Sequence, residues 1–177
     1  MTYWYIFPLV ALVSLLLTAV LRQYALRRSI IDIPNARSSH TVPTPRGGGV
    51  AIVLTFAFSL FVLALLQRVS MAESVALLGS GLLIAVIGFM DDHGHIAARW
   101  RLLGHFIAAA WALFWVQGLP SITVFGFSLS LGWFGHLLGA LYLVWMLNLY
   151  NFMDGIDGIA SLEAICACVG LSLIYFF

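Results

Sequence analysis

Long apolar stretches separated by short polar segments dominate the pattern of this chain. Six such stretches lie near residues 3–21, 47–66, 74–90, 102–116, 133–150 and 159–177. A helix needs about 20 mostly apolar residues to cross a bilayer, so each stretch is a candidate spanning helix. The pattern predicts an all-α fold, a multi-pass transmembrane bundle of about six helices. Because the loops are short, we expect one integral membrane domain over residues 1–177.

Composition agrees with a membrane protein and excludes other classes. Of the 177 residues, 63% are hydrophobic and 8% are charged, which is far from the composition of a soluble globular domain. The formal net charge is only +1, so the chain lacks the basic surface that nucleic-acid binding requires. The first stretch has no basic segment before it and no small-residue cleavage site before Arg22. We therefore expect a retained helix, not a signal peptide.

The arginines predict the orientation of the bundle. The segment from Arg22 to Arg46 carries five of them, and short Arg-rich loops stay in the cytoplasm. The N-terminus is then outside, and alternation places residues 91–101 and 151–158 inside. Arg99 and Arg101 favour the same orientation. The cytoplasmic surface would hold five of the seven acidic residues: Asp32, Asp91, Asp92, Asp154 and Asp157.

Two adjacent carboxylates, Asp91 and Asp92, directly follow the third apolar stretch. Neighbouring carboxylates at a membrane surface repel each other unless a cation compensates their charge. Hard oxygen ligands favour Mg²⁺, which takes one or two protein carboxylates and leaves positions for substrate phosphates. A solvated helix end is the alternative reading. His93 and His95 are candidates for proton transfer or metal binding, or are simply solvated loop residues.

A second polar cluster continues the fifth apolar stretch. Asn148, Asn151, Asp154 and Asp157 recur every three residues, so a helix would align their side chains along one stripe. Polar groups that only faced hydrocarbon would be costly, which favours a binding site over simple capping of the helix end.

Other polar features carry weaker signals. Arg46 and the three glycines after it open the second stretch, a geometry that suits an anion. His105 and His136 lie within apolar stretches, where we expect packing roles. The alternating segment at residues 120–131, with a glycine at its centre, predicts a β-hairpin on the outer side.

Three motifs together resemble one enzyme family. They are DIPNARSSHTVPTPRGGG from Asp32, the Asp91-Asp92 pair continued by ARWRLLGH, and NLYNFMDGIDG from Asn148. In this order they are similar to the polyprenyl-phosphate N-acetylhexosamine-1-phosphate transferases, the first loop most closely to bacterial O-antigen initiating enzymes. The likeness runs from Asp32 to about Ala160.

The resemblance implies an activity and a set of partners. Members transfer N-acetylhexosamine-1-phosphate from a UDP-sugar to undecaprenyl phosphate at the cytoplasmic face of the bacterial inner membrane, use Mg²⁺ and release UMP. It makes Asp91 and Asp92 catalytic and metal-binding, with Asp91 a base for the lipid phosphate or a group that orients it. Substrate contacts carried over by motif are those of Asn148, Asn151, Asp154, Asp157, His40 and Arg46.

The chain departs from that family in two places. A lysine that follows the aspartate pair in the peptidoglycan enzyme is replaced by His93-Gly94-His95, which argues against a muramoyl-pentapeptide donor. Family members also carry a third acidic motif and a His-rich loop in a second half. We therefore expect the N-terminal half of a longer member, with a catalytically incomplete fragment or a membrane scaffold as the alternative. The oligomeric state is open, a homo-oligomer included.

An ion-coupled transporter is a further alternative, because carboxylates at broken helices also bind cations. That class predicts acidic residues near the middle of the bilayer. Here they gather at one face, which favours the transferase.

Overall fold

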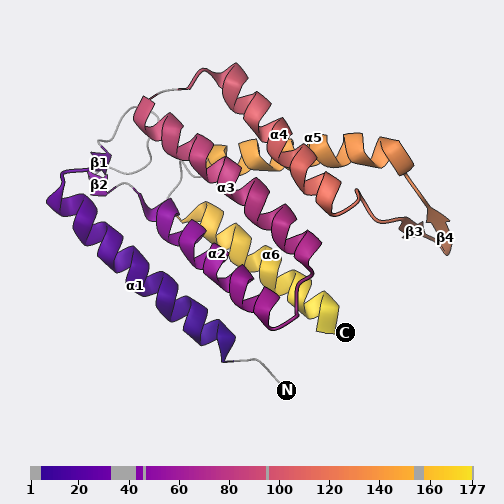
Figure 1. Cartoon of the computed structure of the whole chain (residues 1–177), viewed down its shortest axis with the longest axis horizontal. Helices are drawn as coiled ribbons and strands as arrows, with labels where there is room; N and C mark the ends of the chain where they lie inside the picture. The colour runs from indigo at the N-terminus through magenta and orange to yellow at the C-terminus, as the bar shows by residue number, and fades with distance from the viewer. Residues whose placement is uncertain (1–4, 33–42, 46, 95, 154–157, 177) are drawn as a thin grey trace.

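A computed structural model describes residues 5–32, 43–45, 47–94, 96–153 and 158–176, with the backbone alone at residues 32, 92–94, 122, 124 and 176. This part of the chain contains six helices and two short antiparallel hairpins (Figure 1). The helices are α1 (Ile6–Arg27), α2 (Gly48–Leu65), α3 (Met71–Gly94), α4 (Ala98–Trp115), α5 (Gly132–Met153) and α6 (Ile159–Phe176). The strands are β1 (Ile31–Asp32), β2 (Thr44–Pro45), β3 (Ile122–Val124) and β4 (Phe127–Leu129).

The helical bundle predicted from the apolar stretches is confirmed. Four helices, α1, α2, α3 and α5, are long and apolar enough to cross a membrane. The other two are α4, which carries Arg99 and Arg101 in its first turn, and α6, whose apolar part is shorter. Large apolar side chains lie on the outer surface of the bundle, as on Leu15, Phe58 and Trp145, where lipid would cover them.

Small residues hold the helices together. Each of the first five helices packs on its neighbour in sequence, α3 on α4 most extensively, whereas α6 touches α5 only lightly. The buried positions include Ala76 of α3 and the pair Ala108 and Ala109 of α4. In lipid, where apolar surface alone does not drive association, small residues let helix backbones approach closely enough for dispersion contacts.

A close approach between α3 and α4 lies at Gly79. A β-carbon added there would collide with the indole ring of Trp111. That indole Nε1 donates a hydrogen bond of 3.0 Å to the backbone oxygen of Val75. The missing side chain of Gly79 therefore makes room for both the ring and its hydrogen bond.

We expect Gly79→Ala to destabilise the protein by about 1–3 kcal/mol, since it overpacks the interface and displaces a hydrogen-bonded ring. Unfolding by SDS titration in mixed micelles measures this change. Gly88→Ala is the matched control, because it lies on the same helix with nothing within 4 Å of the added β-carbon. Equal stability of the two variants would show that the Trp111 ring moves aside at no cost.

The turn between α2 and α3 is closed by a capping box. Ser70 donates its backbone N–H and its hydroxyl to Glu73 Oε2, at 2.8 and 2.7 Å, and Glu73 N–H donates back to the Ser70 hydroxyl at 3.2 Å. These reciprocal bonds satisfy donors that the first turn of α3 would otherwise leave unpaired. The Glu73 carboxylate thus has a structural role, because it caps the start of α3 together with Ser70.

The two hairpins differ in the length of chain that they close. The predicted hairpin at residues 120–131 is confirmed as β3 and β4, joined by Phe125 and Gly126 with φ angles of 50° and 84°. Two successive positive φ angles belong to a tight hairpin turn, and glycine adopts such an angle without strain. A second hairpin, which the pattern did not predict, pairs Ile31 with Pro45 and Asp32 with Thr44. It closes the loop between α1 and α2.

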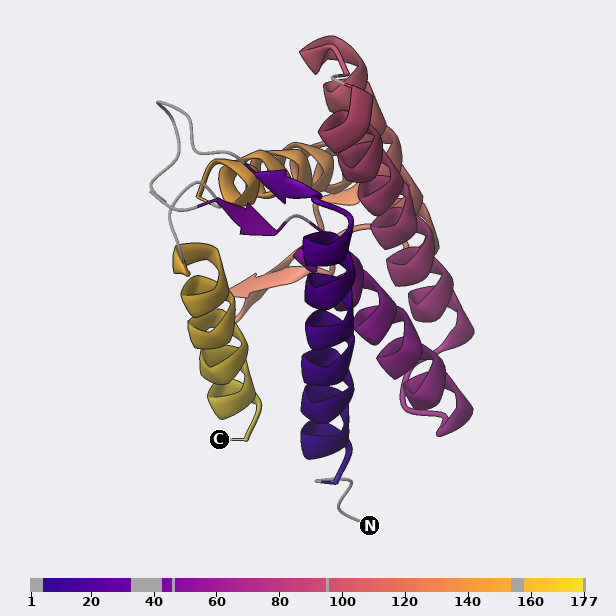
Figure 2. The same ribbon diagram turned by 90° about the vertical axis from the view of Figure 1, so that its left-hand side faces the viewer.

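The helix ends divide between two sides of the bundle. Figure 1 shows the ends of α1, α3 and α5 and the beginnings of α2, α4 and α6 toward the upper left, away from both termini. Figure 2 shows the same division from the side, with the turn between α2 and α3 near the chain termini. The described parts of all three motif segments therefore lie toward one end of the bundle.

Candidate functional site

Asp91 and Asp92 lie in the last turn of α3. The pattern predicted that the pair follows the helix, but α3 continues to Gly94. The last turn of α3 is polar, so a pattern based on apolar residues ends the helix too early. The correction matters because a helix restrains the backbone at both aspartates more than a loop does.

The Asp91 carboxylate links α3 to α4. One oxygen, Oδ1, accepts the backbone N–H of Ile96 at 2.9 Å, and Oδ2 forms an ion pair of 2.7 Å with Arg101 Nη1. The Asp91 and Arg101 side chains are 24% and 33% exposed. A carboxylate beside the first turn of α4 also meets the positive end of that helix dipole. Asp91 therefore connects the last turn of α3 to the start of α4.

An aspartate carboxylate is a hard oxygen donor of the kind that Mg²⁺ prefers. In the structure the Asp91 carboxylate has protein partners in Ile96 and Arg101. Within the described side chains, no group of three or more His, Cys, Asp or Glu residues is close enough to form a metal site. Asp91 and Asp92 as the residues that would hold Mg²⁺ stay a prediction from the sequence.

Asn148 and Asn151 lie one turn apart on α5, as the spacing predicted, and both are exposed. The Asn148 amide nitrogen donates to the backbone oxygen of Val144 at 2.7 Å and lies 3.5 Å from His105 Nδ1 of α4. His105 is buried, at 8% exposure. It has the packing role predicted for it and, in addition, a polar contact with the asparagine motif.

Several predicted site residues have no described side chain. His40, Arg46, His95, Asp154 and Asp157 lie outside the described residues. Asp92 and His93 are described by backbone alone. Their roles stay predictions from the sequence.

The sequence pattern missed Arg101 as a site residue and the contact of His105. Both lie in the ARWRLLGH segment quoted for the family resemblance, but Arg101 was given a role only in orientation and His105 only in packing. One signal was present: the two are four residues apart on α4 and therefore share one face of it. The pattern did not show which neighbours this face meets.

The remaining polar candidates lie outside this cluster. His136 is an exposed residue in the second turn of α5, and its ring packs against Gly118 in the loop before β3. Cys166 and Cys168 are exposed free thiols on α6.

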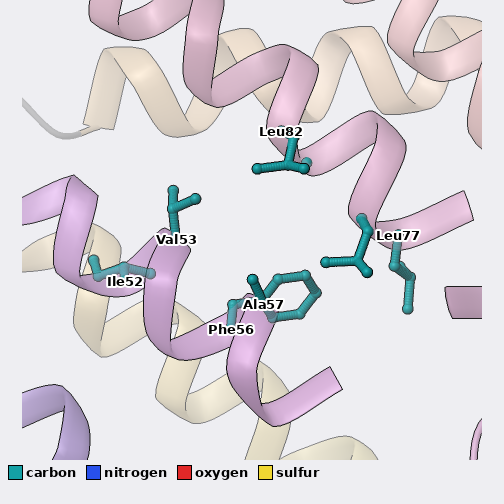
Figure 3. A pocket seen from close by; sticks show the side chains of 8 residues that line it. Ile52, Val53, Phe56, Ala57, Leu77 and Leu82 are labelled. Atoms are coloured by element: carbon teal, nitrogen blue, oxygen red, sulfur yellow. The ribbon is translucent and has the colours of Figure 1, made fainter. Parts of the chain in front are cut away.

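An apolar hollow of about 140 Å³ lies between α2 and α3 (Figure 3). Its volume is below the several hundred Å³ typical of ligand pockets. Every residue of its lining is apolar, so it offers a sugar nucleotide no hydrogen bond. The lining consists of Ile52, Val53, Phe56, Ala57, Leu77, Leu78, Gly81 and Leu82.

The helices and the polar cluster at their ends define a multi-pass membrane protein with a site at one side of its bundle. The sequence model of glycosyl transferase family 4 matches residues 74–177, which include α3 from Ser74 onward, α4 and α5. The match covers more than half of the chain, and the chain belongs to this family.

Relatives with curated functions are sugar-1-phosphate transferases. A probable undecaprenyl-phosphate N-acetylglucosaminyl 1-phosphate transferase of Bacillus subtilis is 28% identical over 168 residues, covering 92% of this chain and 44% of the relative. A decaprenyl-phosphate N-acetylglucosaminephosphotransferase of Mycobacterium tuberculosis is 28% identical over 166 residues, covering 85% and 40%. A phospho-N-acetylmuramoyl-pentapeptide-transferase of Streptococcus pyogenes is 31% identical over 147 residues, covering 74% and 43%.

The chain spans less than half of the length of these relatives. No solved structure matches it significantly.

Proposed function

We propose that the protein takes part in transferring N-acetylhexosamine-1-phosphate from a UDP-sugar to undecaprenyl phosphate, releasing UMP, at the cytoplasmic face of the bacterial inner membrane. The product would initiate a cell-surface polysaccharide such as O-antigen. The observation that carries the proposal is the meeting of the aspartate and asparagine motifs at one end of the bundle, connected through α4. A water-soluble donor and a lipid acceptor can both reach such a place.

The chemistry is an in-line displacement at phosphorus. A lipid phosphate oxygen attacks the β-phosphorus of the UDP-sugar and forms a new P–O–P linkage. The bond between the β-phosphorus and the bridging oxygen breaks, and that oxygen leaves on UMP. Such reactions depend on positioning and on neutralising phosphate charge.

The residues of this chain would divide these tasks. Asp91 and Asp92 would hold Mg²⁺, which when bound neutralises diphosphate charge. The ion pair between Asp91 and Arg101 favours an orienting role for Asp91 over the role of a base. Asn148 and Asn151 are exposed near the end of α5 and would contact the donor, together with Asp154 and Asp157.

The placement of acidic residues argues against the transporter. The described acidic side chains are Asp91 in the last turn of α3, Glu73 at the opposite end of that helix and Glu163 in the second turn of α6. None of the three is near the middle of its helix, where a coupled ion site would be built.

Isotope exchange tests both the reaction and its face. In inverted membrane vesicles that contain the protein, we expect labelled UMP to enter UDP-N-acetylglucosamine once undecaprenyl phosphate is supplied. Sealed spheroplasts should not catalyse it, because their cytoplasmic face is closed to nucleotides. UDP-N-acetylmuramoyl-pentapeptide serves as the comparison donor and should give no exchange.

Each opposing result has a definite meaning. No exchange in inverted vesicles from cells that make the protein would favour a membrane scaffold. Equal exchange in sealed spheroplasts would reverse the proposed orientation.

A further inference from the structure

α4 lies between the two helices that carry the site motifs. It packs on α3 along one side and on α5 along another. Arg101 and His105 are one helical turn apart on α4, and each reaches a different motif. The apolar positions of α4 explain its burial but not this pair of polar contacts.

The first contact is an ion pair in a sheltered place. Arg101 Nη1 lies 2.7 Å from Asp91 Oδ2, and both side chains are no more than one-third exposed. The same carboxylate accepts the N–H of Ile96, within the connection that leads into α4. Two bonds to one side chain restrain both the position and the rotation of the last turn of α3. This geometry distinguishes the pair from an exposed surface ion pair, which contributes little.

The second contact orients an amide. With His105 buried, its Nδ1 faces the Asn148 amide nitrogen at 3.5 Å, and that nitrogen also donates to Val144 at 2.7 Å. With Nδ1 of His105 unprotonated, the two N–H groups of Asn148 have two protein acceptors, His105 Nδ1 and the backbone oxygen of Val144. Its Oδ1 remains for a ligand, so Asn148 would act as an acceptor. His105 then carries its proton on Nε2.

We propose that Arg101 and His105 are positioning residues, which together make α4 a strut that sets the distance between Asp91 and Asn148. Neither residue needs to touch the substrate. The catalytic consequence rests on the proposed function, whereas the strut itself does not. Removing either contact should let the ends of α3 and α5 move relative to each other.

Electron-spin distance measurement tests the strut without any activity. Spin labels are placed by Met90→Cys on α3 and Phe152→Cys on α5, two exposed positions, after Cys166→Ser and Cys168→Ser. In lipid nanodiscs we expect Arg101→Met and His105→Leu each to broaden the distance distribution, and the double variant to broaden it further.

Arg99→Met is the matched control. Arg99 lies on the same turn of α4, and its guanidinium lies over the Trp100 ring with 5.7 Å to the ring centroid. Its distance distribution should equal that of the parent. Identical distributions for the parent, Arg101→Met and His105→Leu would overturn the proposal.

Conservative variants separate positioning from folding. Arg101→Lys keeps the charge, and His105→Asn keeps an acceptor close to the place of Nδ1, so both should restore a narrow distribution. If Arg101→Met or His105→Leu fails to fold, broad distributions for both conservative variants would overturn the strut, since they retain the bulk and polarity of the site.

The UMP-exchange assay tests the catalytic consequence of the strut. Arg101→Met and His105→Leu should lower kcat by up to about a hundredfold with a smaller change in KM, because displaced catalytic groups cost more in the transition state than in binding. Unchanged kcat despite broadened distances would remove the catalytic consequence. Absence of exchange in the parent protein would instead count against the proposed function and leave the distance result standing.

Discussion

Asp92→Asn is expected to lower UMP exchange by at least about a hundredfold, the size of effect seen when one charge-stabilising group is removed from an active site. The substitution keeps the size of the side chain and removes its negative charge. Helix α3 runs past this position to Gly94, and the substitution leaves the backbone hydrogen bonds of the helix in place. Membrane insertion and the amount of protein should therefore match those of the parent.

Asp92 is a sharper test than its neighbour. Substitution of Asp91 would break the ion pair with Arg101 and the bond to Ile96 as well, and so mix structural and chemical effects. Glu73→Gln is the control: its carboxylate lies at the opposite end of α3, bonded to Ser70. It should leave exchange unchanged. Parent-like rates in Asp92→Asn would remove Asp92 from the proposed site.

Removal of divalent cations should have an effect of similar size. EDTA is expected to lower exchange by more than about a hundredfold, because a diphosphate resists attack by another phosphate anion unless its charge is neutralised. Added Mg²⁺ should restore the rate. Ca²⁺ should restore it poorly, since it is larger and prefers more ligands at longer distances.

The Asp92→Asn and Glu73→Gln variants test whether the required cation binds at Asp92. Asp92→Asn should need more Mg²⁺ for its residual exchange than the parent does, whereas Glu73→Gln should show the Mg²⁺ dependence of the parent. Exchange that survives EDTA in the parent would exclude a required divalent cation. An unchanged Mg²⁺ dependence in Asp92→Asn would place the cation on other ligands.

Local pattern predicted the helices and much of their detail. The six apolar stretches correspond to α1 to α6, and the hairpin around Gly126 was expected from its alternation and its glycine. Asn148 and Asn151 lie on one helix as their spacing indicated. These features depend on hydropathy and backbone preference, which neighbouring residues along the chain already express.

The pattern was less accurate where distant residues decide. It ended the third helix before Asp91, because polar residues close an apolar run. In the structure Asp91 pairs with Arg101, ten residues further on, and α3 continues. The hairpin of β1 and β2 was not predicted either, since two-residue strands leave no periodic signal.

The sequence by itself determined that this protein is a bundle of membrane helices, and it identified the residue types of its candidate site. Only the tertiary structure decided which side chains meet. Arg101 and His105 reach Asp91 and Asn148 because close packing at small residues such as Gly79 and Ala108 sets the rotation and depth of α4. Hydropathy is a property of the local chain, whereas these contacts depend on how three helices are turned toward one another.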